Sequence, residues 1–159
     1  MGDYNTEQMC EFVLSRMQEL LEKDGYRRNG KGTIFYRYHA DRRIACVLGM
    51  QKSVNNCYGN FEFTFNVGCV SIDDVMDADP NFFGFRLTLA VLKEYLRSCL
   101  SDRIGFICRG YDVWYDLSEY GLMGRNISQY YNDTILPDIE KVRNCLNEQV
   151  VKKLSKYES

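Results

Sequence analysis

The segment RRIACVLGMQ, residues 42–51, most limits how this chain can fold. Its middle, from Ile44 to Leu48, is apolar at every position, so a strand here carries apolar side chains on both faces. Strands of this kind lie inside a sheet and are covered on both faces. The segment therefore predicts a central strand.

Two further segments predict strands next to it. Residues 33–39, TIFYRYH, precede it and connect to it through the short turn ADR. Residues 61–71, FEFTFNVGCVS, alternate between apolar and more polar side chains, which is the period of a strand with one buried face. Strands that follow one another through short turns favour an antiparallel sheet.

Both ends of the chain predict helices. In residues 6–25, apolar side chains recur at steps of three and four, as on the buried face of a helix. In residues 126–157 the apolar stripe comprises Ile139, Val142, Leu146 and Val150. Asn126 or Ser128 can cap this helix. Pro137 lacks an amide N–H, and we expect it to break or kink the helix into two segments.

The middle of the chain is less regular. Residues 72–80 predict a short acidic loop or turn, and residues 85–97 predict a helix. The end of that helix is alternatively a strand that extends into Arg103. Together the segments predict an α+β fold, with an antiparallel sheet of about five strands and an N-terminal helix and C-terminal helices packed on it. The length of 159 residues fits one domain.

Residues 103–117, RIGFICRGYDVWYDL, predict the last two strands as a hairpin with its loop at Arg109 and Gly110. One face of the hairpin then carries six core-facing residues: Ile104, Phe106, Cys108, Tyr111, Val113 and Tyr115. The expected pairs on the other face are Gly105 with Trp114 and Arg103 with Asp116.

This register places Trp114, the only tryptophan, between Asp112 and Asp116. Two interpretations remain open. Either a helix, for example the C-terminal one, covers this face and buries the indole, or Trp114 is a partly exposed anchor for a partner.

The composition argues against several classes of function. A net charge of −2 gives no global attraction to nucleic acid or to an anionic membrane, and no apolar run is long enough to span a bilayer. The seven cysteines are irregularly spaced and the chain has one histidine, so we expect no metal site and no cofactor. Several cysteines lie in apolar segments, as buried free thiols do, which indicates a reducing, cytoplasmic compartment. No catalytic motif is present, and we expect no enzymatic activity.

Four stretches, DGYRRNGKGTIFYRY, VLGMQKS, FTFNVGCVS and RIGFICRGYDVWYDL, together resemble the family catalogued as domain of unknown function 4304. The shared features fall on Gly25, Tyr26, Phe35, Tyr36, Arg37, Gln51, Lys52, Ser53, Arg103, Ile104, Gly105, Asp112 and Trp114. The resemblance implies a compact bacterial domain with a family-like core at residues 18–118, followed here by a helical segment at about 126–155. It implies no established activity. By analogy with other small families, it suggests an immunity-like protein that neutralises a toxin.

The sequence therefore favours a non-enzymatic interaction domain that binds a protein partner, with an immunity-protein-like role as one version. The candidate binding residues are Trp114, Arg103, Asp112, Asp116, Gln51, Lys52, Arg37 and Tyr36. The alternative is a binder of nucleic acid or of a small ligand through residues 27–43, where basic side chains are interleaved with aromatic ones. The acidic balance of the whole chain argues against nucleic acid.

Overall fold

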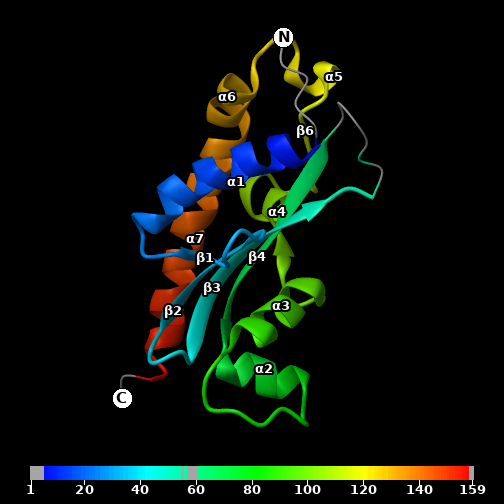
Figure 1. The fold of residues 1–159 in the computed structure, drawn as a ribbon. Helices are drawn as coiled ribbons and strands as arrows, with labels where there is room; N and C mark the ends of the chain where they lie inside the picture. The colour runs from blue at the N-terminus through cyan, green and yellow to red at the C-terminus, as the bar shows by residue number, and fades with distance from the viewer. Residues whose placement is uncertain (1–5, 55, 57–60, 158–159) are drawn as a thin grey trace.

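An antiparallel sheet runs through the centre of the molecule and is flanked by helices (Figure 1). The computed structural model describes residues 6–54, 56 and 61–157. Its elements are α1 (Thr6–Glu22), β1 (Arg27–Arg28), β2 (Ile34–His39), β3 (Ile44–Lys52), β4 (Glu62–Ser71), α2 (Ile72–Ala78), α3 (Leu89–Arg97), β5 (Asp102–Arg103), α4 (Ile104–Cys108), β6 (Tyr115–Asp116), α5 (Glu119–Leu122), α6 (Ile127–Tyr130), the π-helical turn η1 (Tyr131–Ile135) and α7 (Leu136–Leu154).

The sheet follows the order β1–β2–β3–β4, and the short strands β5 and β6 both pair with β4. β3 pairs with β2 and β4 along its length, with Cys46 lying between Arg37 on β2 and Cys69 on β4. This confirms the α+β fold with its antiparallel sheet, and it confirms that residues 44–48 form a central strand.

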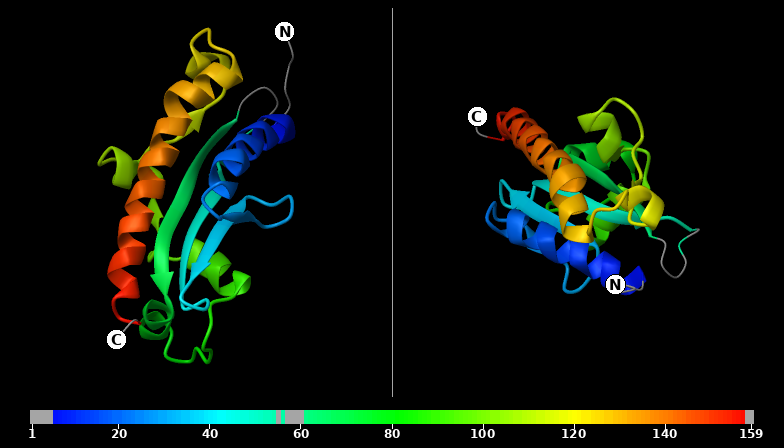
Figure 2. Two further views of the ribbon diagram at one scale, coloured as in Figure 1. Left: turned by 90° about the vertical axis from the view of Figure 1, so that its left-hand side faces the viewer. Right: turned by 90° about the horizontal axis from the view of Figure 1, so that it is seen from above.

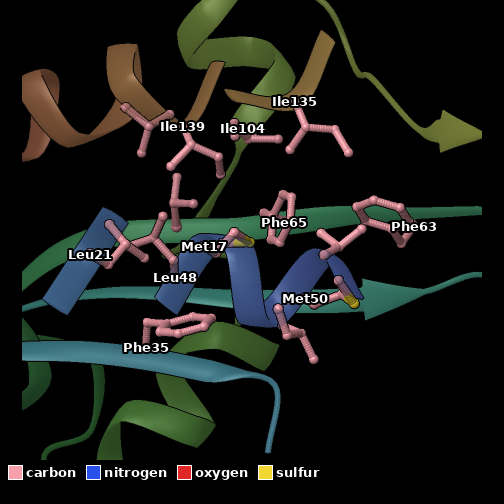
Figure 3. Packing of buried hydrophobic residues seen from close by; sticks show 14 of the residues in the cluster. Met17, Leu21, Phe35, Leu48, Met50, Phe63, Phe65, Ile104, Ile135 and Ile139 are labelled. Atoms are coloured by element: carbon pink, nitrogen blue, oxygen red, sulfur yellow. The ribbon is translucent and has the colours of Figure 1, made fainter. Parts of the chain in front are cut away.

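Different helices cover the two faces of β3. On the first face, α1, α4 and α7 pack against alternate residues of the strands, among them Phe35, Leu48 and Phe65 (Figure 3). On the second face, α2 and α3 pack against a smaller set that includes Ala45 and Val47. Figure 2 shows α7 running alongside the strands for most of their length.

Two glycines bring α3 close to the second face. A Cβ added at Gly68 would lie 1.9 Å from Tyr95 Oη, and one added at Gly49 would lie 2.7 Å from Leu96 Cδ1. Both clashing side chains belong to α3 and are buried. The close fit of the helix on the sheet therefore depends on the absence of a side chain at these two strand positions.

Gly68→Ala is therefore expected to lower the free energy of unfolding by about 1–3 kcal/mol, because the added methyl group overpacks the contact with Tyr95. Chemical denaturation measures this change. In a Tyr95→Ala background the clash is absent, and Gly68→Ala is then expected to be neutral or slightly stabilising, since alanine lowers the backbone entropy of the unfolded chain. If Gly68→Ala alone were as stable as the wild type, this result would contradict the close packing of Tyr95 on Gly68.

Residues 72–78 are a helix, α2, and the prediction of an acidic loop there is wrong. Ser71 and Asp74 form a capping box, in which each side chain accepts the backbone N–H of the other residue. The carboxylates of Asp73 and Asp74 in the first turn also favour a helix N-terminus. The acidic residues begin the helix rather than prevent it.

The next helix, α3, ends at Arg97 as predicted but begins only at Leu89, where Thr88 caps it. Phe85 is the first residue of the predicted helix over 85–97, but it lies before α3 and is 92% exposed. The apolar residues keep their helical spacing on the N-terminal side of Thr88, so this spacing alone did not show where the helix begins.

The hairpin prediction for residues 103–117 is wrong. Ile104–Cys108 form a short helix, and the two flanking strands pair separately with β4 instead of with each other. Within α4, Ile104 and Cys108 are one turn apart and both buried, which in a short segment resembles strand alternation. Val113 and Tyr115 are buried as expected, whereas Phe106 and Tyr111 are exposed.

Gly105 is the residue that permits this turn. A Cβ there would lie 2.3 Å from the carbonyl oxygen of Tyr111 and 2.5 Å from the nitrogen of Val113. The returning chain therefore crosses directly over α4.

Pro137 does not divide the C-terminal helix in two. Residues 127–154 stay helical, and the π-helical turn η1 directly precedes α7, in whose first turn Pro137 lies. The longer hydrogen-bond period of a π turn accommodates the missing amide donor. Asn126 caps α6 as predicted, and the stripe from Ile139 to Val150 is buried.

An ion pair ties α1 to the edge of the sheet. The guanidinium of Arg28 donates to both carboxylate oxygens of Glu11, at 3.1 and 2.9 Å, and its Nε donates to the Gly32 carbonyl at 2.8 Å. The Arg28 side chain is only 4% exposed. The hydrogen bonds from Arg28 and Ser15 lower the pKa of Glu11 to about 2.

Because the pKa of Glu11 is depressed in the folded chain, the pair stabilises the fold above the ordinary glutamate pKa, and this contribution is lost as the pH falls toward 2. Glu11→Gln is expected to cost less than about 1 kcal/mol at neutral pH, since the carboxylate is exposed. The difference in the free energy of unfolding between the variant and the wild type should become smaller as the pH is lowered. Denaturant unfolding at several pH values checks this, and a constant gap would contradict it.

Candidate functional site

A groove of about 690 Å³ opens on the second face of the sheet, beside α3. Its sheet side is formed by β2, β3, β4 and β5, and its other wall by α3 and the segment after it. The polar side chains facing it from the sheet are Gln51, Asn66 and Arg103. From α3 it is lined by Lys93 and Arg97.

The three sheet residues are linked by hydrogen bonds. Asn66 Nδ2 donates to Gln51 Oε1 at 2.8 Å, and Arg103 Nε donates to Asn66 Oδ1 at 3.1 Å. Arg103 stands directly opposite Asn66 in the β4–β5 pairing, which places both side chains on the second face. The sheet register therefore positions this network.

The guanidinium of Arg103 is also held from its far side. Its Nη1 lies 3.2 Å from Asp112 Oδ2, and its Cζ lies 5.1 Å from the centre of the Trp114 ring. Trp114 Nε1 in turn donates to Asp112 Oδ2 at 3.3 Å. We call Gln51, Asn66, Arg103, Asp112 and Trp114 the Arg103 network.

Trp114 is partly exposed, with 36% of its surface accessible. The C-terminal helix packs on the opposite face of the sheet and does not cover it. Arg103 and Asp112 side chains are 28% and 39% exposed. The network thus lies at the surface, preorganised by its own contacts.

The groove carries positive charge. Lys93, Arg97 and Arg103 line it, and none of its described lining residues is acidic. Arg97 pairs with Glu94 at 3.3 Å, but both side chains are more than 70% exposed, so solvent screens that pair. Such a groove favours an anionic group of a ligand or partner.

Three other candidate residues lie elsewhere. Lys52 alternates to the first face, where its ammonium group lies near the thiol of Cys10. The Asp116 carboxylate accepts the backbone N–H of Ser118 at 2.9 Å, so it caps the turn to α5 and does not pair with Arg103. Tyr36 projects from β2 onto the second face but outside the groove.

Arg37 and the remaining basic residues of 27–43 divide into two groups. Arg28 is bound to Glu11, and Arg43 donates to the Ala40 carbonyl and stacks on Tyr157. Arg37 lines a separate notch together with other arginines. Some basic residues of the segment 27–43 therefore stabilise the fold, and others line a surface that is available for binding.

Sequence reasoning missed a buried polar cluster around Asp138. Arg109 Nη2 and Tyr115 Oη each donate to Asp138 Oδ2 at 2.7 Å. Burial and this hydrogen bond raise the pKa of Tyr115, and the same carboxylate raises the pKa of Arg109. Burial raises the pKa of the adjacent Cys108 thiol to about 11, so it is a poor nucleophile.

The Asp138 cluster joins the end of α4 and β6 to α7, and its Asp138 and Tyr115 side chains are buried, so its role is to hold these elements together. Asp138 directly follows Pro137 in the first turn of a helix, and nothing in the sequence indicated a buried acid there. A second missed feature is the loop before α3, where Phe83 and Phe85 are 94% and 92% exposed.

Comparison with models of protein families, with curated proteins and with solved structures finds no match for this chain. The resemblance to the domain of unknown function 4304 family therefore stays a prediction. Among the described residues, no helix is both long and apolar enough to cross a bilayer. The same part of the chain contains no group of three metal-ligating side chains.

Arg103→Gln is expected to loosen the indole of Trp114, because it removes both the cation–π contact and the ion pair that holds Asp112. The loss of stability should stay below about 1 kcal/mol, as for exposed pairs and exposed cation–π contacts. Since Trp114 is the only tryptophan, acrylamide quenching and fluorescence anisotropy report on it directly.

Arg97→Gln is the control, since it removes an arginine of the same groove that has no contact with Trp114 among the described interactions. Its tryptophan signal should match the wild type. Identical quenching in the Arg103→Gln variant and the wild type would show that the stacking does not hold the indole.

Proposed function

We propose that this chain is a non-enzymatic recognition domain that binds an acidic segment of a protein partner in the groove beside the Arg103 network. The observation that carries the proposal is the guanidinium of Arg103, held over Trp114 at the end of an open, positively charged groove. Tryptophan and arginine are the residue types most enriched among the residues that dominate binding energy at protein interfaces.

The preorganisation of Arg103 supports this function. Its hydrogen bond to Asn66 and its pairing with Asp112 restrict the side chain before any partner arrives. Less rotamer entropy is then lost on binding, which strengthens association for a given set of contacts. The guanidinium has five N–H donors, and those not used within the network remain for a partner carboxylate.

The charge of the groove indicates the kind of partner. A chain with a net charge of −2 presents three basic side chains here and no acidic one among the described lining residues. An acidic partner segment complements this surface, and electrostatic attraction also speeds its association. The exposed Trp114 supplies an apolar contact beside the charged one.

An immunity-like role, in which the partner is a toxin, is the version that the family resemblance suggests. The cytoplasm is the compartment that we propose, which the six described free cysteines support. The proposal that the groove binds a protein depends neither on the partner being a toxin nor on the compartment being the cytoplasm.

The test begins with affinity capture from the source cells and continues with the purified partner. A captured protein supports the proposal only when the reconstituted pair binds and shifts the fluorescence of Trp114. Trp114→Ala and Arg103→Gln are each expected to weaken the purified complex by about tenfold or more, as for residues central to an interface.

Tyr120→Ala is the matched control, since Tyr120 is another exposed aromatic residue, 89% accessible and outside the groove. Its complex should keep wild-type affinity. Circular dichroism establishes that each variant is folded. A purified complex that is insensitive to both Trp114→Ala and Arg103→Gln would overturn the proposal.

A further inference from the structure

A second basic surface lies at the β2 edge of the sheet, just beyond the end of β1. It is a notch of about 390 Å³ lined by Gly25, Arg27, Tyr36, Arg37, Tyr38 and Arg42. The notch shares no lining residue with the groove beside α3. Three arginines and two tyrosines thus line a small space at the sheet edge, Arg37 from the first face and Tyr36 and Tyr38 from the second.

Within the described part of the chain, the arginines of this notch differ from most other arginines because none of them has a carboxylate partner. Seven arginines pair with an acidic side chain within the described residues: Arg28, Arg86, Arg97, Arg103, Arg109, Arg125 and Arg143. No described carboxylate lies within ion-pair distance of Arg27, Arg37 or Arg42. In a chain with more acidic than basic residues, three uncompensated arginines at one place indicate an anion site.

A contact that leaves the charge intact holds one of these arginines, Arg42. The Arg42 guanidinium lies over the Tyr38 ring, 4.6 Å from its centre, and Tyr38 packs edge-on against Tyr36 with ring centres 5.4 Å apart. Stacking on an aromatic ring uses the face of the guanidinium and leaves its N–H donors in the plane free.

The backbone at Gly25 and Arg42 shapes the notch. Gly25 has a φ of +84°, which favours glycine, and a Cβ added there would lie in van der Waals contact with Arg37 Nε, at 3.4 Å. Ala40, Asp41 and Arg42 are three successive non-glycine residues with positive φ, of 53°, 54° and 66°. This left-handed turn is a costly conformation for such residues, and it presents Arg42 toward the edge of β2.

We propose that the notch binds the phosphate group of a small phosphorylated molecule. Planar guanidinium groups bind phosphate oxygens through paired hydrogen bonds, and a dianionic phosphate complements a notch lined by three arginines. A volume of about 390 Å³ holds a phosphate together with a sugar-sized group. A long polyanion is disfavoured because the chain as a whole carries a net charge of −2, whereas a small ligand contacts only the notch.

The experiment titrates the full-length chain with inorganic phosphate, with adenosine monophosphate and with adenosine, at constant ionic strength, by isothermal calorimetry and by NMR shifts. The two phosphate-bearing probes are expected to bind and adenosine is not. Arg37→Gln and Arg42→Gln should each weaken phosphate binding by about tenfold or more, as for loss of a charge-assisted hydrogen bond.

Lys152→Gln is the matched control, because it removes one positive charge from an exposed position on α7, outside the notch. It should leave the affinity for phosphate within about twofold of the wild type. Circular dichroism confirms the fold of each variant, and Arg27→Gln provides a third substitution should one of the others misfold.

The absence of phosphate binding at millimolar concentration would overturn the proposal, as would binding that survives both Arg37→Gln and Arg42→Gln. A single-stranded RNA oligonucleotide serves as the remaining probe. If it binds with a steep salt dependence while the small phosphates do not, the ligand is a nucleic acid and the proposal fails. These variants leave the Arg103 network unchanged, so their outcome is independent of partner binding in the groove.

Discussion

The pairing of β3 with β4 is the constraint on which the rest of the structure depends. It runs from Ile44 opposite Ser71 to Lys52 opposite Phe63, and it determines on which of the two faces each paired residue lies. A slip of β4 by one position would turn Asn66 into the core beneath α7 and move Phe63 and Phe65 out of it to the other face. Burial of the phenylalanines therefore selects the register, and the register in turn places the polar residues of the other face.

That second face changes in character along the strands. Near the ends where Ala45 and Val70 lie, it is apolar and covered by helices. Gly49 and Gly68 follow, where α3 comes closest. Beyond them lie Gln51 and Asn66, in the groove that α3 leaves open. The same helix contact thus sets both the packing of this face and the boundary of its candidate binding surface.

Arginine has two roles in this protein, and its partner decides which. Beside carboxylates, as in the contacts of Arg28 with Glu11 and Arg109 with Asp138, it joins elements that are distant in the sequence. Over an aromatic ring, as in the contact of Arg42 with Tyr38, the guanidinium is positioned but not neutralised. Arg103 combines both arrangements, since it contacts Asp112 and Trp114 together. Positioned charge at the surface can contribute to recognition, whereas the arginine–carboxylate pairs between distant elements contribute to the fold.

The sequence by itself determined the central strand, the strands beside it and the helices at the two ends, because their burial follows a period of two or of about four residues. It also indicated Arg103, Asp112 and Trp114 as a group, although through a hairpin that does not form. Only the tertiary structure decided that Ile104–Cys108 is a helix, that Asp138 is buried, and that Lys52 and Asp116 lie away from Arg103. A short segment such as Ile104–Cys108 satisfies either period, and the choice depends on contacts such as the close approach of Gly105 to the returning chain. These contacts join residues that only the complete fold brings together, so no local pattern records them.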